Sequence, residues 1–540
     1  MSNLLNRLTE SLSRTSRACI HYGDAWYSSG TLRKDIETVV HLLDDSRLRR
    51  GDRVLLGYPN SYAFVVVYFA ILQSGAIAVP FNPDLKKNEL AMFLIRTKAR
   101  FGFFHKNLEV MLREICTGGV SSNDVATSIT LESAFITDRL ELGVPEMAWT
   151  AHSDILSQVT VGDGHCGDSP STAETFAIDD HTPSDQISDE DAAVLMYTSG
   201  TTGRPKAVVL RHRHLLATAS QIIESHQLTS DDVSYCFLPL FHINAQVVAV
   251  LSTLLSGGRI VIAPRFSASR FWASICEHQV TWVSAVPTVI AILQNVDGPE
   301  ETPASLRFVR SASAQLPQLV ARRFERRFGV PIIQSYGMTE AASQICVNPL
   351  PPGERRSDSV GLPMGVELRI VDEDDCDVSV GTVGEVLLRG SSVIERYEEA
   401  DNQNDFRGGW FHTGDMGRVD ADGYVYLTGR KKELINRAGE KVSPYEVEDV
   451  IREHPAVEQV AVIGLPDPMY GEEVAAYVVV RESTQALEGL TVEILTLCQE
   501  SLSRYKWPSK IQVVSQLPVG PTGKIQRTSL KKKVLSAMIS

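Results

Sequence analysis

The sequence has few of the features that mark secreted, membrane-spanning or nucleic-acid-binding proteins. Its eight cysteines are scattered and none forms a C-x-x-C pair, so we expect reduced thiols in a cytoplasmic protein and neither disulfides nor a zinc site. Every long hydrophobic run is broken by glycine or polar residues, so we expect no membrane span. Basic residues are outnumbered, with 52 Lys and Arg against 66 Asp and Glu and a net charge of −14, which argues against nucleic-acid binding.

The order of hydrophobic segments favours an α/β protein with more than one domain. A chain of 540 residues is too long for one ordinary core. Apolar strands alternate with helical patterns, as in the strand predicted at 52–58 and the helix predicted to follow it, which indicates mainly parallel sheets. We expect a large N-terminal domain of such sheets with helices over 1–429 and a small, mobile α+β domain over 430–540. The polar, acidic stretch 161–190 predicts an exposed loop.

The stretch YTSGTTGRPKAV, residues 197–208, resembles a phosphate-binding loop without matching the Walker pattern. A predicted strand precedes it and "AVVL" begins another, so the loop should join two strands and have no helix dipole behind it. Phosphate would then be held by loop N–H groups, hydroxyls and a lysine ammonium. Taken alone, the stretch also fits a surface turn. The candidate phosphate-binding residues are Thr198, Ser199, Gly200, Thr201, Thr202, Gly203 and Lys206.

Four later motifs follow this loop in a fixed order. They are QSYGMTE (334–340), GWFHTGD (409–415), GRKKELINRAGEKVSP (429–444) and PTGKIQR (521–527). Together with the loop they resemble the adenylate-forming superfamily of acyl-CoA synthetases, adenylation domains and beetle luciferases. The resemblance implies two steps that use ATP, Mg²⁺ and CoA: a carboxylate forms acyl-AMP and pyrophosphate, and a thiol then displaces AMP. It also implies a C-terminal domain that swivels between the steps.

The resemblance assigns the reacting groups of the first step. Glu340 would bind Mg²⁺, which prefers carboxylate oxygen, and Thr339 would contact the α-phosphate. Lys524 would be the catalytic lysine that bridges the acid and the α-phosphate. Lys432 occupies the family's hinge position.

The resemblance also assigns the adenosine and CoA contacts. Tyr336 would stack on adenine opposite the wall at 311–315, and Asp415 would accept the ribose hydroxyls. Arg430 would contact ribose or phosphate, and the turn at Gly439 would line the pantetheine tunnel. The remaining predicted nucleotide-site residues are Ser313, Ala314, Gln334 and Gly337.

Three positions depart from the family pattern. Ala207 replaces the glycine after the loop lysine and should be tolerated if its φ is negative. Ala438 replaces the first of two glycines near the tunnel, and Ser313 replaces a glycine and adds a hydroxyl to the acid pocket.

The identity of the acid stays open between two classes. FHINAQ (241–246), RSASAQL (310–316) and neighbouring segments resemble the oxalate–CoA ligases of plants and fungi, which implies that His242 and Ser313 bind a small diacid. Against this, a tunnel beside Ala245, Val248 and Ala249 would admit a fatty or aryl tail.

We expect an acid–CoA ligase, and three alternatives remain. The acyl group could pass instead to the phosphopantetheine of a carrier protein, because the thiol is the same. A luciferase-like oxygenase would share the motifs, and a non-enzymatic nucleotide-binding protein would share the fold.

Overall fold

The computed structural model describes the chain in eleven segments. They are residues 1–14, 16–118, 131, 133–137, 150–151, 187–198, 206–299, 301–398, 405–481, 489–519 and 525–539. The predicted loop at 161–190 lies outside these residues except for its last four. Also outside them are Ser199, Gly200, Thr201, Thr202, Gly203 and Lys524.

The first sheet has seven strands, and the phosphate-loop motif joins two of them. Strands β3, β4, β5, β6 and β8 run parallel, and β9 returns antiparallel to β8 so that Thr198 pairs with Lys206. The prediction that this loop connects two strands is therefore confirmed. In spatial order the strands are β7 (Thr150–Ala151), β6 (Ser133–Thr137), β5 (Phe101–His105), β3 (Arg53–Gly57), β4 (Ile77–Pro80), β8 (Ala192–Thr198) and β9 (Lys206–Arg211).

Helix α3 (Tyr62–Gln73) is hydrophobic all round, as a helix enclosed on every side must be. Ser61 caps it by accepting a hydrogen bond from the Phe64 N–H. It packs on β3, β4 and β1 and against α2, and therefore belongs to the core that the two N-terminal sheets share. The other helices of this part are α1 (Asn3–Ser13), α2 (Ser29–Asp45), α4 (Lys87–Thr97), η1 (Lys106–Leu108) and α5 (Glu109–Gly118).

The second sheet has nine strands, of which β1, β10, β11, β12, β13 and β14 run parallel. One face packs into the main core and the other forms a separate aromatic-rich core. In order the strands are β16 (Leu362–Pro363), β15 (Cys346–Val347), β14 (Ile332–Tyr336), β13 (Phe308–Ser311), β12 (Trp282–Ala285), β10 (Val233–Cys236), β11 (Arg259–Ile262), β1 (Ala18–Tyr22) and β2 (Ala25–Ser28).

A π-helix, η4 (Asn244–Leu251), contacts β10 and β12 of this sheet. Eight residues in this conformation are rare, and π-helical turns recur at functional sites. The apolar run that contains η4 forms a buried helix, a turn and a strand. The other helices around the sheet are α6 (His212–Ser225), α7 (Ser252–Leu255), α8 (Ala268–His278), α9 (Pro287–Leu293), α10 (Gln318–Phe328) and η5 (Thr339–Ala341).

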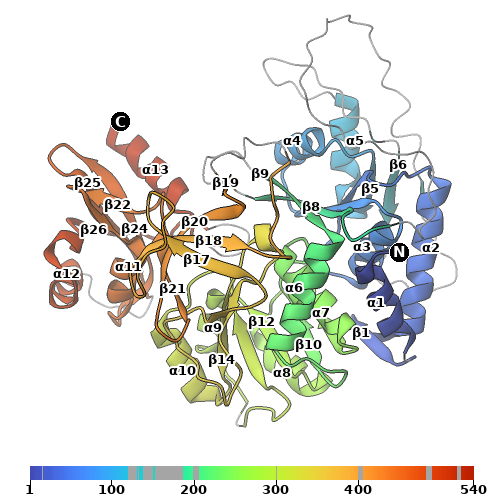
Figure 1. Cartoon of the computed structure of the whole chain (residues 1–540), viewed down its shortest axis with the longest axis horizontal. Coiled ribbons are helices and arrows are strands. Elements are labelled where there is room, and N and C mark those ends of the chain that lie inside the picture. Colours follow the sequence, from blue (N-terminus) through green and yellow to red (C-terminus); the bar gives the residue numbers. More distant parts are fainter. Residues whose placement is uncertain are drawn as a thin grey trace, which may run out of the picture.

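A third, antiparallel sheet connects these layers to the C-terminal part (Figure 1). Its strand β20 runs through the predicted ribose site, and β21 pairs with β20 so that Asp415 lies opposite Arg430. Its strands are β17 (Glu367–Val371), β18 (Gly384–Arg389), β19 (Phe406–Arg407), β20 (Trp410–Val419) and β21 (Val425–Arg430).

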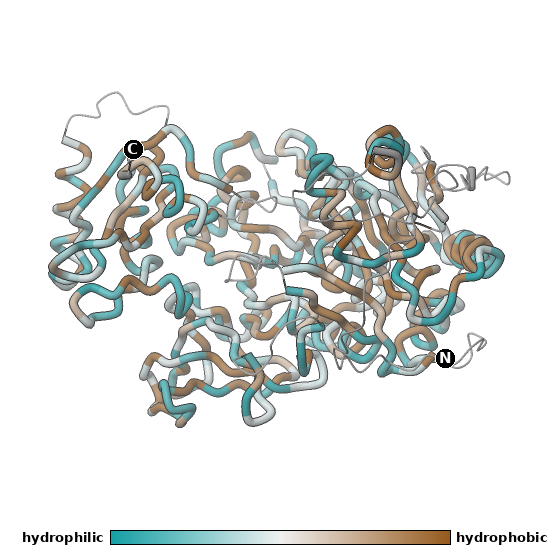
Figure 2. Tube along the Cα trace, turned by 90° about the horizontal axis from the view of Figure 1, so that it is seen from above, coloured by the Kyte–Doolittle hydropathy of each residue, from teal (hydrophilic) through white to brown (hydrophobic). Residues whose placement is uncertain are grey.

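The fourth sheet begins at β22, five residues after β21 ends. It lies at the end of the molecule away from the N-terminus (Figures 1 and 2). Helix α11 packs on β24, and this part has its own hydrophobic cores. Its elements are β22 (Ile435–Arg437), β23 (Glu440–Val442), α11 (Pro444–Arg452), β24 (Val457–Asp467), β25 (Gly471–Val480), α12 (Leu490–Ser501), η6 (Arg504–Lys506), β26 (Lys510–Val513) and α13 (Arg527–Ile539).

The α/β fold class, with a large N-terminal part and a smaller C-terminal part, is confirmed by this architecture. The boundary at 429/430 stays a prediction. The seven described cysteines are free thiols. None of the helices in the described ranges has the length and apolar character needed to traverse a bilayer.

Candidate active site

Three of the predicted adenosine contacts meet at one carboxylate. Tyr336 ends strand β14, and its Oη donates a hydrogen bond of 2.5 Å to Oδ2 of Asp415. The Arg430 Nε lies 2.9 Å from Oδ1 of the same carboxylate. Burial raises the pKa of Tyr336 well above its usual value, and the negative charge of Asp415 adds to this, so the phenol stays protonated. The carboxylate is therefore fixed from both sides with free lone pairs left on each oxygen.

The predicted metal ligand and the predicted phosphate lysine contact the same tyrosine. Tyr397 Oη donates to Oε1 of Glu340 at 2.9 Å, and the Lys206 Nζ lies 4.4 Å from the centroid of the Tyr397 ring. Lys206 also pairs with Asp405 at 2.5 Å. Tyr397 belongs to none of the sequence motifs, so the sequence did not predict it as a site residue.

The surroundings of Glu340 fit a magnesium ion that also binds substrate phosphates. Its side chain is buried, and burial raises its pKa, so a cation at this carboxylate would favour the charged form. No group of three or more metal-ligating side chains occurs among the described residues. Mg²⁺ typically needs only one or two protein carboxylates, because waters and phosphates complete its shell.

The predicted site residues that precede Glu340 have different surroundings. Thr339 begins the short helix η5 and is half-buried. Gly337 is required by packing, since a Cβ placed there would lie 1.3 Å from the carbonyl oxygen of Ser343. Gln334 donates its amide N–H to the Ser357 carbonyl at 2.5 Å. Its predicted contact with the base edge stays a prediction.

The predicted acid pocket combines a neutral histidine and a strained serine. Burial lowers the pKa of His242 to about 4, and its Nε2 is buried without a hydrogen-bond partner in the described parts of the chain. Ser313 has φ of 72°, in the left-handed region that favours glycine. Its Oγ accepts a long hydrogen bond of 3.5 Å from Asn244 Nδ2. Ser313 and Ala314 are exposed, and their place in an acid pocket stays a prediction.

The residues proposed to line a tunnel for a long tail are closed to solvent. Ala245, Val248 and Ala249 have exposed fractions of 0%, 0% and 3%, and all three belong to the main hydrophobic core. A fatty or aryl tail would have to displace η4 to pass them.

The C-terminal part meets the site through its first helix. Gln315, two residues after Ser313, donates to Asp449 of α11 at 3.0 Å. Arg527, three residues after Lys524 in the sequence, donates to the Tyr445 hydroxyl at 3.0 Å. Tyr445 packs against Gly429, next to Arg430. The described residue Arg527 therefore reaches the nucleotide side of the molecule through Tyr445.

The predicted hinge and tunnel residues lie on the C-terminal side of this contact. Lys432 is exposed in the turn between β21 and β22. Gly439 and Ala438 form the exposed turn between β22 and β23, with φ of 92° and 54°. Ala207 is absent from the residues with positive φ, so its replacement of a glycine is tolerated as expected.

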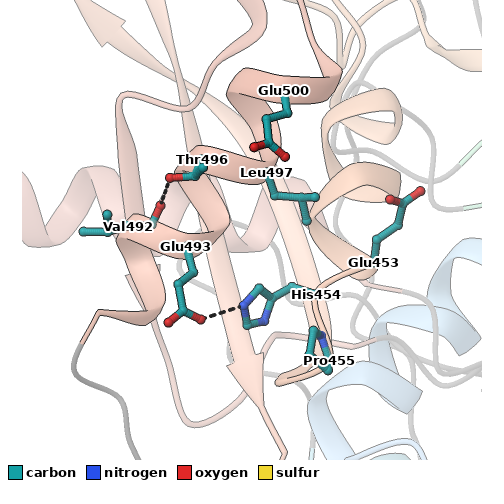
Figure 3. A pocket seen from close by; sticks show the side chains of 8 residues that line it. All are labelled: Glu453, His454, Pro455, Val492, Glu493, Thr496, Leu497 and Glu500. Atoms are coloured by element: carbon teal, nitrogen blue, oxygen red, sulfur yellow. Dashed lines mark hydrogen bonds and ion pairs between the residues drawn. The ribbon is translucent and has the colours of Figure 1, made fainter.

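A surface hollow on the C-terminal part is separate from these residues (Figure 3). It lies between the end of α11 and α12, and His454 contacts Glu493 across it at 3.1 Å. Its other acidic residues are Glu453 and Glu500. It contains none of the predicted site residues.

Comparison with known proteins places this arrangement in a family. The model of the AMP-binding enzyme family matches residues 10–398, and that of the AMP-binding enzyme C-terminal domain matches residues 446–524. The chain belongs to the AMP-binding enzyme family. The predicted superfamily and the predicted enzyme class, an AMP-forming acid–CoA ligase, are confirmed at this level.

Relatives within the family carry ligase names. The chain is 44% identical to a sulfoacetate–CoA ligase of Cupriavidus necator over 63% of this chain and 66% of that protein. It is 34% identical to an oxalate–CoA ligase of Arabidopsis thaliana over 90% of this chain and 89% of that one. A solved O-succinylbenzoate CoA synthetase of Bacillus subtilis, in complex with ATP and magnesium ion, is 27% identical with a TM-score of 0.78, covering 97% and 99% of the two chains.

Proposed function

We propose that this ligase joins CoA to a short carboxylic acid that carries a second anionic group, using ATP and Mg²⁺. The observation that carries the proposal is Ser313, a strained hydroxyl on the open pocket wall that contacts Asn244. A non-glycine residue in the left-handed region costs roughly 1–2 kcal/mol, so a hydroxyl kept there points to a use. The closed wall at Val248 and the names of the relatives, which act on sulfoacetate and oxalate, support the same acid class.

In the first step a carboxylate oxygen of the acid attacks the α-phosphorus of ATP, and pyrophosphate leaves. Asp415, held by Tyr336 and Arg430, would fix the ribose, and Lys206 would neutralise phosphate oxygens. Glu340 would hold Mg²⁺, which supplies charge neutralisation to the phosphates. Lys524 would bring its ammonium to the acid and the α-phosphate together.

In the second step the CoA sulfur attacks the acyl carbon and AMP leaves. The turn at Ala438 and Gly439 is exposed, so a rotation of the C-terminal part about Lys432 would bring it to the site without breaking a core. A carrier-protein thiol would serve the same chemistry, and no described feature favours it.

The test measures pyrophosphate and AMP release with ATP, Mg²⁺ and acids from oxalate and sulfoacetate to benzoate and palmitate, each with and without CoA. We expect CoA-dependent turnover with the short dianions. Turnover with benzoate or palmitate alone would discard the proposed acid class. Adenylate that CoA cannot discharge would point to a carrier protein.

The role of Lys524 is tested on the separate steps. Lys524→Ala should lower adenylation about 1,000-fold, because one positioned cation at a charged transition state is removed. AMP release from supplied acyl-AMP and CoA should change much less. Equal losses in both steps would contradict the role, and Lys532→Ala on helix α13 is the matched control.

A further inference from the structure

Arg310, on strand β13, is a buried cation without an anionic partner. Its side chain is fully buried, and Nη1 and Nη2 donate to the hydroxyls of Ser284 at 3.3 Å and Ser335 at 2.8 Å. Its Nε has no hydrogen-bond partner, and no carboxylate pairs with it, among the residues that the structure describes. Burial lowers its pKa to about 9, so the guanidinium is still charged at neutral pH.

A buried charge of this kind is costly unless something compensates it. The protein side offers no compensation in the described residues around it. His226 carries no negative charge, and burial, with a smaller contribution from Arg310, holds its pKa well below the usual range. Asp232 is paired with Arg307, three residues before Arg310, at 2.5 Å.

Polar contacts lead from Arg310 to the acid pocket. Ser284, its register partner on β12, donates to Asn244 Oδ1 at 3.2 Å, and Asn244 contacts the exposed Ser313. Arg310 and Ser284 lie one residue before the carboxyl ends of their strands. That edge is where open α/β sheets bind their ligands. Three polar side chains, those of Ser284, Asn244 and Ser313, thus connect the uncompensated charge of Arg310 to the pocket.

We propose that Arg310 is a positioning residue that makes the pocket prefer acids with a second anionic group, a carboxylate or a sulfonate. That group binds the Asn244 amide and the Ser313 hydroxyl, and the Arg310 charge behind Ser284 balances it. This inference rests on the proposed function and adds the residue that sets its acid preference.

The experiment compares oxalate and sulfoacetate with the monoanion propionate in ATP–pyrophosphate exchange. Arg310→Met should lower kcat/KM for both dianions about 100-fold, mainly through KM, because a charge at this range in a partly buried site is worth about that factor. KM for ATP and kcat/KM for propionate should change less than about threefold. Arg310→Lys, which keeps the charge, should restore most of the dianion preference.

Controls separate this role from a structural one. Arg307→Gln, three residues earlier, should leave the dianion-to-propionate ratio unchanged. If Arg310→Met does not fold, Ser284→Ala, which breaks the polar connection, should lower the same ratio about tenfold. An unchanged ratio in these variants, or an equal loss with all acids, would overturn the inference and leave the acid class standing. Wild-type enzyme that rejects both dianions would overturn the proposed function and the inference with it.

Discussion

Among the residues that the structure describes, two arginines are buried, one in each part, and their surroundings differ. Arg527, in the C-terminal part, donates two hydrogen bonds from Nη2 to the carboxylate of Glu448, at 2.8 and 2.7 Å, and a third from Nε at 3.0 Å. Glu448 is completely buried, and Arg452 also binds it. Arg310, in the N-terminal part, has serine hydroxyls as its described partners.

The comparison distinguishes a charge used for folding from one used for binding. Both charges of the Arg527–Glu448 ion pair belong to the protein, so the pair can fix α13 against α11 whether or not a ligand is bound. The Arg310 guanidinium gains a counter-charge only when an anion enters the pocket. Buried polar groups without partners are few in native proteins, and each one calls for a reason of this kind.

Acidification should have the largest effect on stability, a loss of about 5 kcal/mol in the N-terminal part. Burial lowers the pKa of His212 and His242 to about 4, that of His214 to about 3 and that of His226 well below 6.5, and all four belong to the N-terminal part. Because these folded-state pKa values are depressed, the unfolded chain binds more protons below pH 6.5 and stability falls as pH falls. Each histidine should contribute about 1.3 kcal/mol of loss between pH 7.5 and 5.5.

Hydrogen exchange resolved by segment measures this loss, because a protein of several cores does not unfold in one step. Protection of β12 and β13 should fall on going to pH 5.5. Replacing His226 by Phe should reduce the slope by about a quarter. A slope that the replacement leaves unchanged would contradict the assignment to these histidines.

The second-largest effect on stability should come from breaking the Arg527–Glu448 ion pair. Glu448→Gln should destabilise the C-terminal part by about 3 kcal/mol, because Arg527 then stays buried without its counter-charge. Arg310→Met should leave the stability of the N-terminal part within about 1 kcal/mol of wild type or raise it, because the charge it removes has no partner to lose. Exchange protection of β24 and β13 reports the two results. A similar large loss at both sites would break the comparison.

Sequence reasoning found the parts of the site that lie within motifs. Tyr336, Asp415 and Arg430 each belong to a recognisable segment, and the fold brings them together. It did not find Tyr397 or Asn244, because each acts through contacts with residues that are 57 and 69 positions away. No local pattern records such a contact.

Arg310 shows the same limit in another form. Its place in the RSASAQL segment was noted for the serine at 313, and nothing in a strand pattern tells whether an arginine there faces a carboxylate or only hydroxyls. The sequence pattern likewise does not distinguish the π-helix that carries Asn244 from an ordinary buried helix. Burial and partner identity, which decide what these residues do, are properties of the packed sheet.

Ser313→Gly should change stability by a smaller amount, and it should raise stability while it lowers activity. Removing a Cβ at φ of 72° should stabilise the protein by about 1 kcal/mol. The same change removes the hydroxyl at Asn244 and should lower kcat/KM for oxalate about tenfold, with propionate affected less. Thermal unfolding and pyrophosphate exchange measure the two effects. A gain in stability with unchanged acid preference would remove Ser313 from the pocket.

Ala438 offers the matching glycine replacement in the C-terminal part, with the smallest expected effect. Its φ of 54° is strained for alanine, but the turn is exposed and its N–H is held by the Tyr470 carbonyl at 2.7 Å. Ala438→Gly relieves the strain yet adds freedom to the unfolded chain, so stability should rise by only about 0.5 kcal/mol. No side chain with a polar atom is lost, so acid preference should stay unchanged.

The informative readout for Ala438→Gly is the second step. If this turn lines the path of the thiol, removing one methyl should lower KM for CoA without changing adenylation. An effect on adenylation and none on KM for CoA would mean that the turn serves the first step. The assignment of this turn to the CoA step would then be wrong. The same result in Ser313→Gly would carry no such meaning, because Ser313 contacts Asn244 within the N-terminal part.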